Sequence, residues 1–473
     1  MNVVIIGAGY VGLVTGCCLA EAGHRVVCVD HDAEKLAGLR SGRLPFHEPE
    51  LVTILGEQLA SGRLLFEDSV ARAMPNADLV FLAVGTPSQT DGSANLENLL
   101  RCANELAATA FSDCMVVVKS TVPVGTGDRL EALLNENRDQ HSGHPRIRVV
   151  SNPEFLAEGR AVQDFRHPDR IVIGANDAGS AAALAQLYAP FDVDGMRLMF
   201  MDRRSAEFAK YACNAMLAAR ISMINELAGL ASGFGADIEA VCGVLKGDPR
   251  IGGSYLHPGV GYGGSCLPKD LSALITCAKT IGEPADMLCS TQRVNNRQGR
   301  RLLEFIREYF RGELRGKRIA IWGLSFKPAT DDVRAAPSLA LIRGLLNEGA
   351  LVSAYDPVAM KAASLALGAT PVVFGASAMS VCEGADALVL MTEWDEFKAP
   401  DFKALAMCMQ GSMVFDARNL YQGSMLRQYG LQHFALARCA RPKGDNAGLS
   451  GRTSPVRPET AQAQAHGGEK PYS

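Results

Sequence analysis

The chain has 473 residues, too many for one ordinary hydrophobic core, and this length predicts two or three domains. Its apolar fraction of 48% and charged fraction of 21% are typical of a globular protein and argue against disorder over most of the chain. The net charge of −4 creates no overall field that would attract nucleic acid or an anionic membrane, so neither is expected as a partner.

Neither a membrane span nor an export signal is expected in this sequence. No apolar run reaches the ~20 residues that cross a bilayer, and residues 1–7 lack the basic region and cleavage site of a signal peptide. The thirteen cysteines are scattered, which favours reduced thiols in the cytoplasm. Without a CxxC pair or an HExxH motif, no metal site is expected.

The N-terminal segment follows the order strand, glycine turn, helix, strand. Residues 3–6 form a continuous apolar run, as a parallel strand buried on both faces requires. A helical stretch ends near Gly23, and residues 25–30 form a second strand that ends in an acid. This alternation predicts a doubly wound α/β domain over residues 1–200. Further strands are expected at residues 79–84, 115–119 and 148–151.

The turn itself has the Gly-x-Gly-x-x-Gly pattern of a dinucleotide site, placed between a strand and a helix as that site requires. Gly7 allows the tight turn, Gly9 lets a pyrophosphate approach the backbone, and Gly12 lets the helix pack against the strand. The phosphates would lie at the helix N-terminus. Asp30 is placed to accept hydrogen bonds from ribose hydroxyls and would repel a 2′-phosphate, so NAD is expected rather than NADP.

A long helix is expected over residues 203–232, ended by Gly233 and Gly235. At 1.5 Å per residue it would be roughly 45 Å long, longer than one domain usually needs. We therefore expect it to bridge two domains and to form a subunit interface within a central helical domain, residues 201–300.

From Gly316 the α/β alternation restarts and echoes the N-terminal order without its full glycine set. This predicts a second, modified nucleotide-binding domain over residues 301–438. Its strands are expected at residues 318–322, 351–355, 385–392 and 413–416, with a helix at 338–348. Residues 439–473 are rich in Pro, Gly, Ser, Gln and charge, and a disordered tail is expected there.

Cys266 lies in a glycine-rich loop, residues 259–270, with Lys269 and Asp270 close behind it. A buried cysteine is usually only a small hydrophobe. This one differs because the loop exposes backbone and because a nearby cation lowers a thiol pKa. The residues alone make Cys266 a candidate nucleophile.

Several long motifs in the same order resemble those of the UDP-glucose/GDP-mannose dehydrogenase family, and the resemblance extends from Gly7 to Arg418. Besides the glycine turn and the cysteine loop, they are Gly-Thr-Pro at 85–87, Ser-Thr-Val-Pro-Val-Gly at 120–125, Asn-Pro-Glu-Phe-Leu-Ala-Glu-Gly at 152–159, Lys-Tyr-Ala-Cys-Asn-Ala at 210–215, Gly-Leu-Ser-Phe-Lys-Pro at 323–328 and Thr-Asp-Asp-Val-Arg at 330–334. The resemblance implies two Rossmann-like doubly wound parallel-sheet domains joined by a central helical domain with a long helix.

The family's reaction, as the resemblance implies it, is a four-electron oxidation of a sugar CH2OH to a carboxylate with two NAD+ and no free aldehyde. Cys266 would form the thiohemiacetal and then the thioester. Lys210 and Asn214, four residues apart on one helix face, would hold the reacting oxygen. Glu154 is expected as acid and base at thioester hydrolysis, where water would be oriented by Asp270 together with Thr121.

The resemblance also implies two sets of binding residues. Glu158 would contact the cofactor or the sugar, and Arg250 would reach the substrate from a partner subunit, which implies a homodimer or larger assembly. The expected cofactor-contacting residues are Gly7, Gly9, Tyr10, Val11, Gly12, Asp30, Lys35, Thr86, Pro87, Thr121, Glu158, Lys269 and Arg334. The expected substrate-contacting residues are Glu154, Phe155, Leu156, Lys210, Asn214, Arg250, Tyr255, Gly259, Gly263, Phe326, Lys327 and Arg418.

Four alternatives remain at this point. The loop at residues 257–262 and the motif at 330–334 resemble the branch of the family that oxidises UDP-glucose more than the branch that oxidises GDP-mannose, while enzymes of N-acetylated UDP-sugars have a different cysteine loop. A non-catalytic nucleotide-sugar binding protein would not need Cys266, Lys210 and Asp270. A two-electron hydroxyacid dehydrogenase would need neither Cys266 nor a second nucleotide domain.

Overall fold

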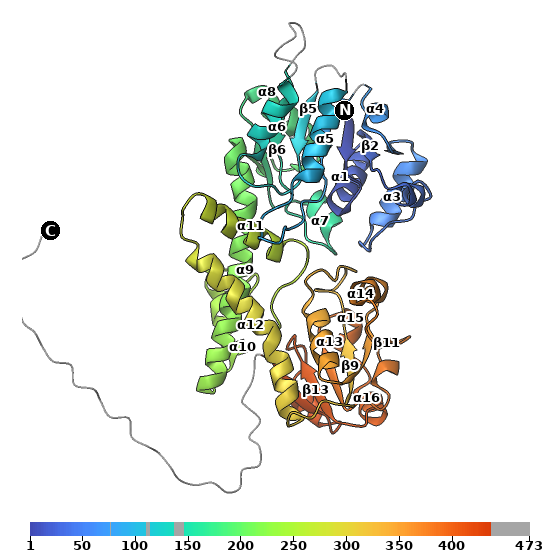
Figure 1. Ribbon diagram of the computed structural model, residues 1–473, viewed down its shortest axis with the longest axis vertical. Coiled ribbons are helices and arrows are strands. Elements are labelled where there is room, and N and C mark those ends of the chain that lie inside the picture. Colours follow the sequence, from blue (N-terminus) through green and yellow to red (C-terminus); the bar gives the residue numbers. More distant parts are fainter. Residues whose placement is uncertain (76, 110–113, 137–145, 437–473) are drawn as a thin grey trace, which may run out of the picture. The chain divides into compact units, whose positions relative to one another are not determined.

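The computed structural model describes residues 1–75, 77–109, 114–136 and 146–436. These residues form two parallel sheets, each covered by helices on both faces, and a central group of helices (Figure 1). This is the predicted fold class. The tail expected at residues 439–473 lies outside the described residues.

The first sheet has eight strands in the order β3-β2-β1-β4-β5-β6-β7-β8. Its first six strands have the doubly wound order 3-2-1-4-5-6, and all neighbours are parallel except β6 and β7. The strands that were not predicted include β3 at one edge and β7 and β8 at the other; β8 has the short apolar sequence Leu-Met-Phe-Met, although its two central side chains are exposed. The bounds are β1 Asn2–Ile6, β2 Arg25–Val29, β3 Leu64–Glu67, β4 Leu79–Leu82, β5 Met115–Val118, β6 Arg148–Ser151, β7 Ile171–Gly174 and β8 Leu198–Met201.

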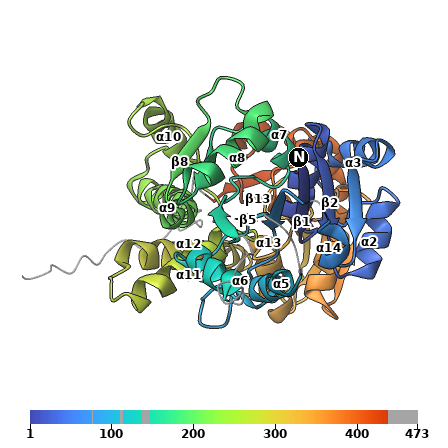
Figure 2. The ribbon, with the colours of Figure 1, turned by 90° about the horizontal axis from the view of Figure 1, so that it is seen from above.

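Alternate residues of β1 belong to two different hydrophobic cores, one on each face of the sheet. Val3 and Ile5 pack with α1, α7 and α8, whereas Val4 and Ile6 pack with α5 and α6 on the opposite face (Figure 2). The helices of this domain are α1 Tyr10–Glu21, α2 Ala33–Arg40, α3 Leu51–Ala60, α4 Val70–Ala73, α5 Glu97–Ala108, α6 Thr126–Asn135, α7 Ala161–Arg166, α8 Ala178–Tyr188 and the 3-10 helix η1 Ala189–Phe191.

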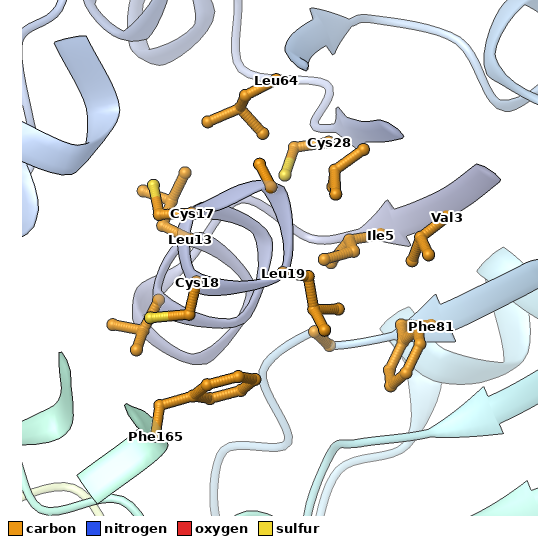
Figure 3. Packing of buried hydrophobic residues seen from close by; sticks show 14 of the residues in the cluster. Val3, Ile5, Leu13, Cys17, Cys18, Leu19, Cys28, Leu64, Phe81 and Phe165 are labelled. Carbon is orange, nitrogen blue, oxygen red and sulfur yellow. The ribbon is translucent and has the colours of Figure 1, made fainter. Parts of the chain in front are cut away.

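Helix α1 is buried on all sides, because every residue from Gly12 to Ala20 is shielded from solvent. Figure 3 shows Cys17 and Cys18 among the apolar side chains around this helix, with Cys28 facing it from β2. These three are free thiols, and burial raises the pKa of each above the ordinary thiol value. They act as small core hydrophobes, as expected for most cysteines of this chain.

The central helices are organised around α9. This helix runs from Arg203 to Phe234. Its N-cap is Asp202, whose side chain accepts a hydrogen bond from the Ser205 amide, and its C-cap is Gly235, with φ +72°. Its 32 residues correspond to roughly 48 Å, in agreement with the predicted long helix. It contacts the three other central helices, α10 Ile238–Gly247, α11 Leu267–Thr280 and α12 Asp286–Tyr309.

The second sheet has six parallel strands in the order β11-β10-β9-β12-β13-β14, which repeats the doubly wound order. Asp356 follows β10 as Asp30 follows β2, but its carboxylate accepts hydrogen bonds from the amides of Leu324 and Ser325 and from the indole of Trp394. That acid is therefore occupied within the protein. The bounds are β9 Arg318–Trp322, β10 Leu351–Tyr355, β11 Val372–Phe374, β12 Ala387–Leu390, β13 Met413–Asp416, β14 Gln432–Ala435, α13 Pro337–Asn347, α14 Met360–Leu367, the 3-10 helix η2 Ser380–Cys382, α15 Asp395–Lys398, α16 Phe402–Cys408 and α17 Gly423–Arg427.

Among the described residues, none of the helices combines the length and apolar character that a bilayer crossing demands. In the same part of the chain, no three His, Cys, Asp or Glu side chains are grouped in a way that could hold a metal ion.

Candidate functional site

The glycine turn between β1 and α1 has the geometry that each glycine was expected to provide. Gly7 has φ +107°, and a Cβ there would lie 2.7 Å from the Ala83 carbonyl oxygen. A Cβ at Gly12 would lie only 1.8 Å from the Gly7 oxygen, so any side chain would push α1 away from the strand. A Cβ at Gly9 would meet no protein atom within 4 Å, which leaves space for a phosphate beside the backbone.

Asp30 stands at the end of β2, beside this turn. Its carboxylate accepts hydrogen bonds from the Ala8 amide at 3.0 Å and from Lys35 Nζ at 2.8 Å. Burial alone would raise the pKa of Asp30, but the hydrogen bond from Lys35 and those from backbone amides lower it below the ordinary value. The carboxylate is thus charged at neutral pH and available to ribose hydroxyls.

Two cavities of about 580 and 210 Å³ meet at Gly9. Asp30 and Lys35 line the smaller one, which suits an adenosine. The hydroxyl of Thr86 donates to the Thr121 carbonyl oxygen at 2.8 Å and joins two loops of the larger one. Of the residues expected to contact the cofactor, the larger cavity is lined by Gly9, Tyr10, Val11, Thr86, Pro87, Thr121, Glu158, Lys269 and Arg334, and the smaller by Gly7, Gly9, Asp30 and Lys35. Gly12 lies behind them as a packing residue.

Cys266 lies at the N-terminus of α11, where the larger cofactor cavity meets a third cavity of about 420 Å³. Both cavities are lined by Cys266, so its sulfur is accessible to ligands in either. This placement allows a nucleophile to act on a substrate carbon that faces a cofactor ring.

The expectation that Lys269 lowers the pKa of the Cys266 thiol is wrong. The pKa is raised, first by burial and then by the charge of Glu154, and the opposing cation is Lys210. Lys269 instead pairs with its neighbour Asp270, which neutralises it locally. The thiol is therefore protonated at neutral pH when the site holds no substrate.

Four polar residues behind Cys266 form two buried pairs. Lys210 Nζ lies 3.1 Å from Glu154 Oε1, and Asn214 Nδ2 donates to Asp270 Oδ2 at 2.6 Å. Lys210 and Asn214 lie one turn apart on α9, as their spacing predicted. Burial would lower the pKa of Lys210, but Glu154, Cys266 and Asp270 raise it, so the ammonium form is favoured. Thr121 lines the cofactor cavity, and among the described residues no hydrogen bond joins it to Asp270.

The third cavity gathers nearly all the residues expected to contact a substrate. Arg418 donates to the carbonyl oxygens of Phe326 and Met391, which fixes its side chain at the wall. A Cβ at Gly263 would lie 2.4 Å from the Ala335 oxygen, so the cysteine loop packs closely on the second α/β domain. The expected residues that line this cavity are Phe155, Leu156, Lys210, Asn214, Tyr255, Gly259, Gly263, Phe326, Lys327 and Arg418.

Two expected substrate contacts lie elsewhere. Glu154 lines the cofactor cavity and not the third cavity. Arg250 follows α10, its exposed side chain pairs with Asp248, and it does not line any of the described cavities of this chain.

Glu158 links the first and second α/β domains and lines both the larger cofactor cavity and the third cavity. It accepts hydrogen bonds from Ser265 Oγ at 3.0 Å, from Thr330 Oγ1 at 3.3 Å and from Arg334 at 3.4 Å. Burial, followed by the charge of Asp332, raises its pKa to about 7. It is therefore a structural link as well as a possible ligand contact, and no sequence signal indicated the link.

Sequence reasoning missed three side chains at these cavities. The Arg170 guanidinium lies 4.1 Å from the centre of the Phe155 ring, at the wall of the third cavity, and His257 lines the same cavity. Lys119, next to the Ser-Thr-Val-Pro motif, is buried beside the cofactor cavity. Arg170 precedes a strand without any local motif, so only the folded chain reveals it.

Comparison with known proteins gives similarity along nearly the whole described chain. Residues 1–192 match the NAD binding domain, residues 204–297 the central domain and residues 320–423 the UDP binding domain of the UDP-glucose/GDP-mannose dehydrogenase family. The matched ranges include the glycine turn, the cysteine loop and Lys327.

Individual proteins are also similar to this chain over nearly its whole length. A UDP-glucose 6-dehydrogenase from Pseudomonas aeruginosa is 45% identical, across 93% of this chain and 98% of that protein. One from Rhizobium meliloti is 41% identical, across 93% of this chain and 100% of that protein. The solved structure of a UDP-glucose dehydrogenase from the hyperthermophilic archaeon Pyrobaculum islandicum has a TM-score of 0.83 and 36% identity, and the match covers 92% of this chain and 97% of that one.

Proposed function

Since the chain belongs to the UDP-glucose/GDP-mannose dehydrogenase family, we propose that it is a UDP-glucose 6-dehydrogenase, which oxidises the sugar CH2OH group to a carboxylate with two NAD+. The observation that carries the proposal is the position of Cys266, which lines both the cofactor cavity and the cavity beside the UDP binding domain. A nucleophile at that junction is what a four-electron oxidation without release of an aldehyde requires.

The residues of the first domain fit NAD. Space beside Gly9, the tight turn at Gly7 and the charged Asp30 suit a pyrophosphate and an unphosphorylated ribose. Bound NAD+ supplies the acceptor for the electron pair and hydrogen that each oxidation removes from the sugar carbon. Thr86 and Thr121 line the same cavity as Cys266, which would hold the nicotinamide ring.

The chain's own residues carry the covalent steps. After the first oxidation, Cys266 Sγ bonds to the aldehyde carbon, and the carbonyl oxygen gains a proton to give a thiohemiacetal. The second oxidation removes that hydroxyl proton together with two electrons and one hydrogen from carbon, and leaves a thioester. Water then adds to the thioester carbon, the C–S bond breaks, and the thiol and the carboxylate separate.

Two buried pairs would support these steps. Lys210 and Asn214 donate hydrogen bonds, so both suit the oxygen of the reacting carbon as it becomes negative. Glu154 is a charged acceptor beside Lys210 and would take the proton from the attacking water. Asp270, with Thr121, would orient that water.

The diphosphate and the base would occupy the third cavity. Lys327 and Arg418 supply positive charge there, which the net charge of −4 does not provide globally. In the ligand-free site, Arg418 pairs with Glu393 at 3.1 Å. Burial lowers the pKa of Lys327, and the negative charge of a bound diphosphate would oppose this effect by favouring the ammonium form.

The protein would act as a homodimer or a larger assembly. Exposed apolar side chains follow one face of α9 at heptad spacing, namely Met216, Met223 and Leu230, and Phe234 continues them. Arg220, on the same helix, donates to the carbonyl oxygens of Ile251 and Gly252 and thereby fixes the loop that carries Arg250. A second copy on this face would bring its Arg250 toward the substrate cavity. Sedimentation of the wild type and of Met223→Asp tests this assembly, which a monomeric wild type would refute.

The cytoplasm is the expected location, because free thiols such as Cys17, Cys18 and Cys28 persist in a reducing compartment. A reporter fusion, located after separation of the cytoplasmic and exported fractions of the cells, would check this assignment.

The proposed reaction is tested by the yield of NADH from limiting UDP-glucose with excess NAD+. Two NADH per sugar are expected. One NADH would mean that the reaction stops at the aldehyde, and none would direct the search to GDP-mannose or other nucleotide sugars. Cys266→Ser should bind UDP-glucose and NAD+ but fail to reach two NADH, whereas a two-electron enzyme would keep turning over.

A further inference from the structure

We propose that Lys119 transfers protons from Glu154 into a further cavity that adjoins the active site, and that this cavity is the path by which the protons of the reaction leave. The inference rests on the proposed function. Oxidation of R–CH2OH with two NAD+ and one water yields R–COO−, two NADH and three protons, so atoms and charge balance only if three protons leave the site. A bound cofactor and a bound sugar would cover the direct route to solvent.

Lys119 is a buried cation that the catalytic scheme does not use. It follows β5 directly, and only 5% of its surface is exposed. Its ammonium group donates to Asn152 Oδ1 at 3.0 Å and to the Tyr188 hydroxyl at 3.4 Å. The Tyr188 hydroxyl itself donates to Asn152 Oδ1 at 2.6 Å, so both partners of Lys119 are neutral. A buried lysine without a bonded carboxylate is costly and therefore needs a reason.

The position of Lys119 between two cavities supplies that reason. Lys119 and Glu154 both line the cofactor cavity, and both also line a cavity of about 510 Å³ along the segment that follows β6. This cavity adjoins the third cavity, with which it shares Phe155, Tyr255 and Lys327. The far wall of this cavity includes the exposed residues His167 and Asp169. Its volume and polar lining suit a group of water molecules that reaches the surface.

The charges around Lys119 favour exchange of its proton. The charged groups that face it are Glu154, which favours the ammonium form, and Lys210, which disfavours it; the phenol of Tyr188 stays neutral because burial raises its pKa. Burial dominates and lowers the pKa of Lys119 to about 8. At neutral pH the group can therefore lose a proton, which an ordinary lysine with a pKa near ~10.4 rarely does.

The relay has two steps. The ammonium of Lys119 gives a proton to water in the cavity, which carries it to the surface. The resulting amine then takes the proton that Glu154 has received from the attacking water or from the sugar hydroxyl. Glu154 returns to the carboxylate that the next step needs, and Lys119 returns to its starting form.

Lys119→Ala, Lys119→Met and Lys119→Arg test the relay in the full-length enzyme, with two NADH per UDP-glucose first established for the wild type. If the wild type fails that stoichiometry, the proposed function fails, whatever the variants do. We expect Lys119→Met and Lys119→Arg to bind UDP-glucose normally and to lose kcat by roughly 10²-fold. Ethylamine should restore kcat in Lys119→Ala in proportion to the concentration of free amine.

The results separate a relay from a fixed charge. Arginine keeps the charge but holds its proton, so a Lys119→Arg variant with wild-type kcat would overturn the relay. Full activity in Lys119→Met, or an Ala variant that amines do not rescue, would also overturn it. If these variants do not fold, Tyr188→Phe provides the test: with one acceptor of the ammonium removed, the inflection in kcat near pH 8 should move to lower pH, and an unchanged inflection contradicts the proposal.

Discussion

The ammonium group of Lys210 lies 3.1 Å from Oε1 of Glu154, and both side chains are almost completely shielded from solvent. The pair joins α9 to the segment that follows β6, and the Leu156 amide donates to the other carboxylate oxygen. Burial would raise the pKa of Glu154, but Lys210 lowers it below its ordinary value. Each partner thus keeps the other charged inside the site.

Removal of one partner should therefore destabilise the protein more than removal of both. Lys210→Met takes away the cation bonded to Glu154, and we expect a loss of about 3–5 kcal/mol in the free energy of unfolding. The double variant with Glu154→Gln should recover part of that loss. Urea unfolding measures the free energy of unfolding of the single and the double variant. Lys403→Met, at an exposed position, is the matched control and should change this free energy little. Additive losses would contradict the pairing.

The Cys266 thiol should react slowly with iodoacetamide at pH 7 in the ligand-free protein, and its rate should still rise above pH 9, because its pKa lies above the ordinary value of 9.0. Lys210→Met should slow the reaction further, since it removes a cation that lowers this pKa. Peptide mapping by mass spectrometry identifies alkylation at position 266, with Cys266→Ser as the blank. A rate that reaches its plateau by pH 8 would mean that the resting thiol is activated.

Cofactor selectivity should depend on Asp30 and on its partner Lys35. Asp30→Ser removes a charged acceptor of the ribose hydroxyls, which costs about 1.5–3 kcal/mol, or roughly a ten- to hundredfold loss of kcat/KM for NAD+. It also releases Lys35, which would then be available to a 2′-phosphate. We expect kcat/KM for NADP+ to rise in this variant. A variant that still rejects NADP+ as strongly as the wild type would show that selectivity resides elsewhere.

The protonation of Glu158 should make the folded protein less stable as the pH rises from about 4.5 to 7. Its pKa is about 7 in the folded protein, above its ordinary value of 4.5, so the folded state holds more protons than the unfolded state between these values. The folded form therefore loses stability as the pH increases from about 4.5 to 7. Glu158→Gln should reduce this loss, measured as the Tm of the ligand-free protein at successive pH values. If the Tm values of the two proteins depend on pH in the same way, the pKa of Glu158 is not raised in the folded protein.

Much of the fold could be predicted because its signals are local. The strands expected at residues 148–151, 318–322, 351–355 and 413–416 coincide with β6, β9, β10 and β13. Expected strands 79–84, 115–119 and 385–392 extend beyond the observed ones, because their last residues leave the sheet to line the sites: Val84 and Lys119 border the cofactor cavity. Edge strands such as β8 were not predicted, since an apolar run of only four residues cannot be assigned to a strand by its pattern alone.

The sequence by itself determined most of the elements and indicated Cys266 as the candidate nucleophile, because the glycine turn, the length of α9 and the cysteine loop are each encoded by adjacent residues. Only the tertiary structure decided which charges meet. It brings Lys210 to Glu154 from 56 positions away, joins Asn214 to Asp270, and buries Lys119 between two cavities. The reason is physical: backbone conformation depends mainly on neighbouring residues, whereas burial and Coulomb interactions depend on distances between segments that only folding brings together.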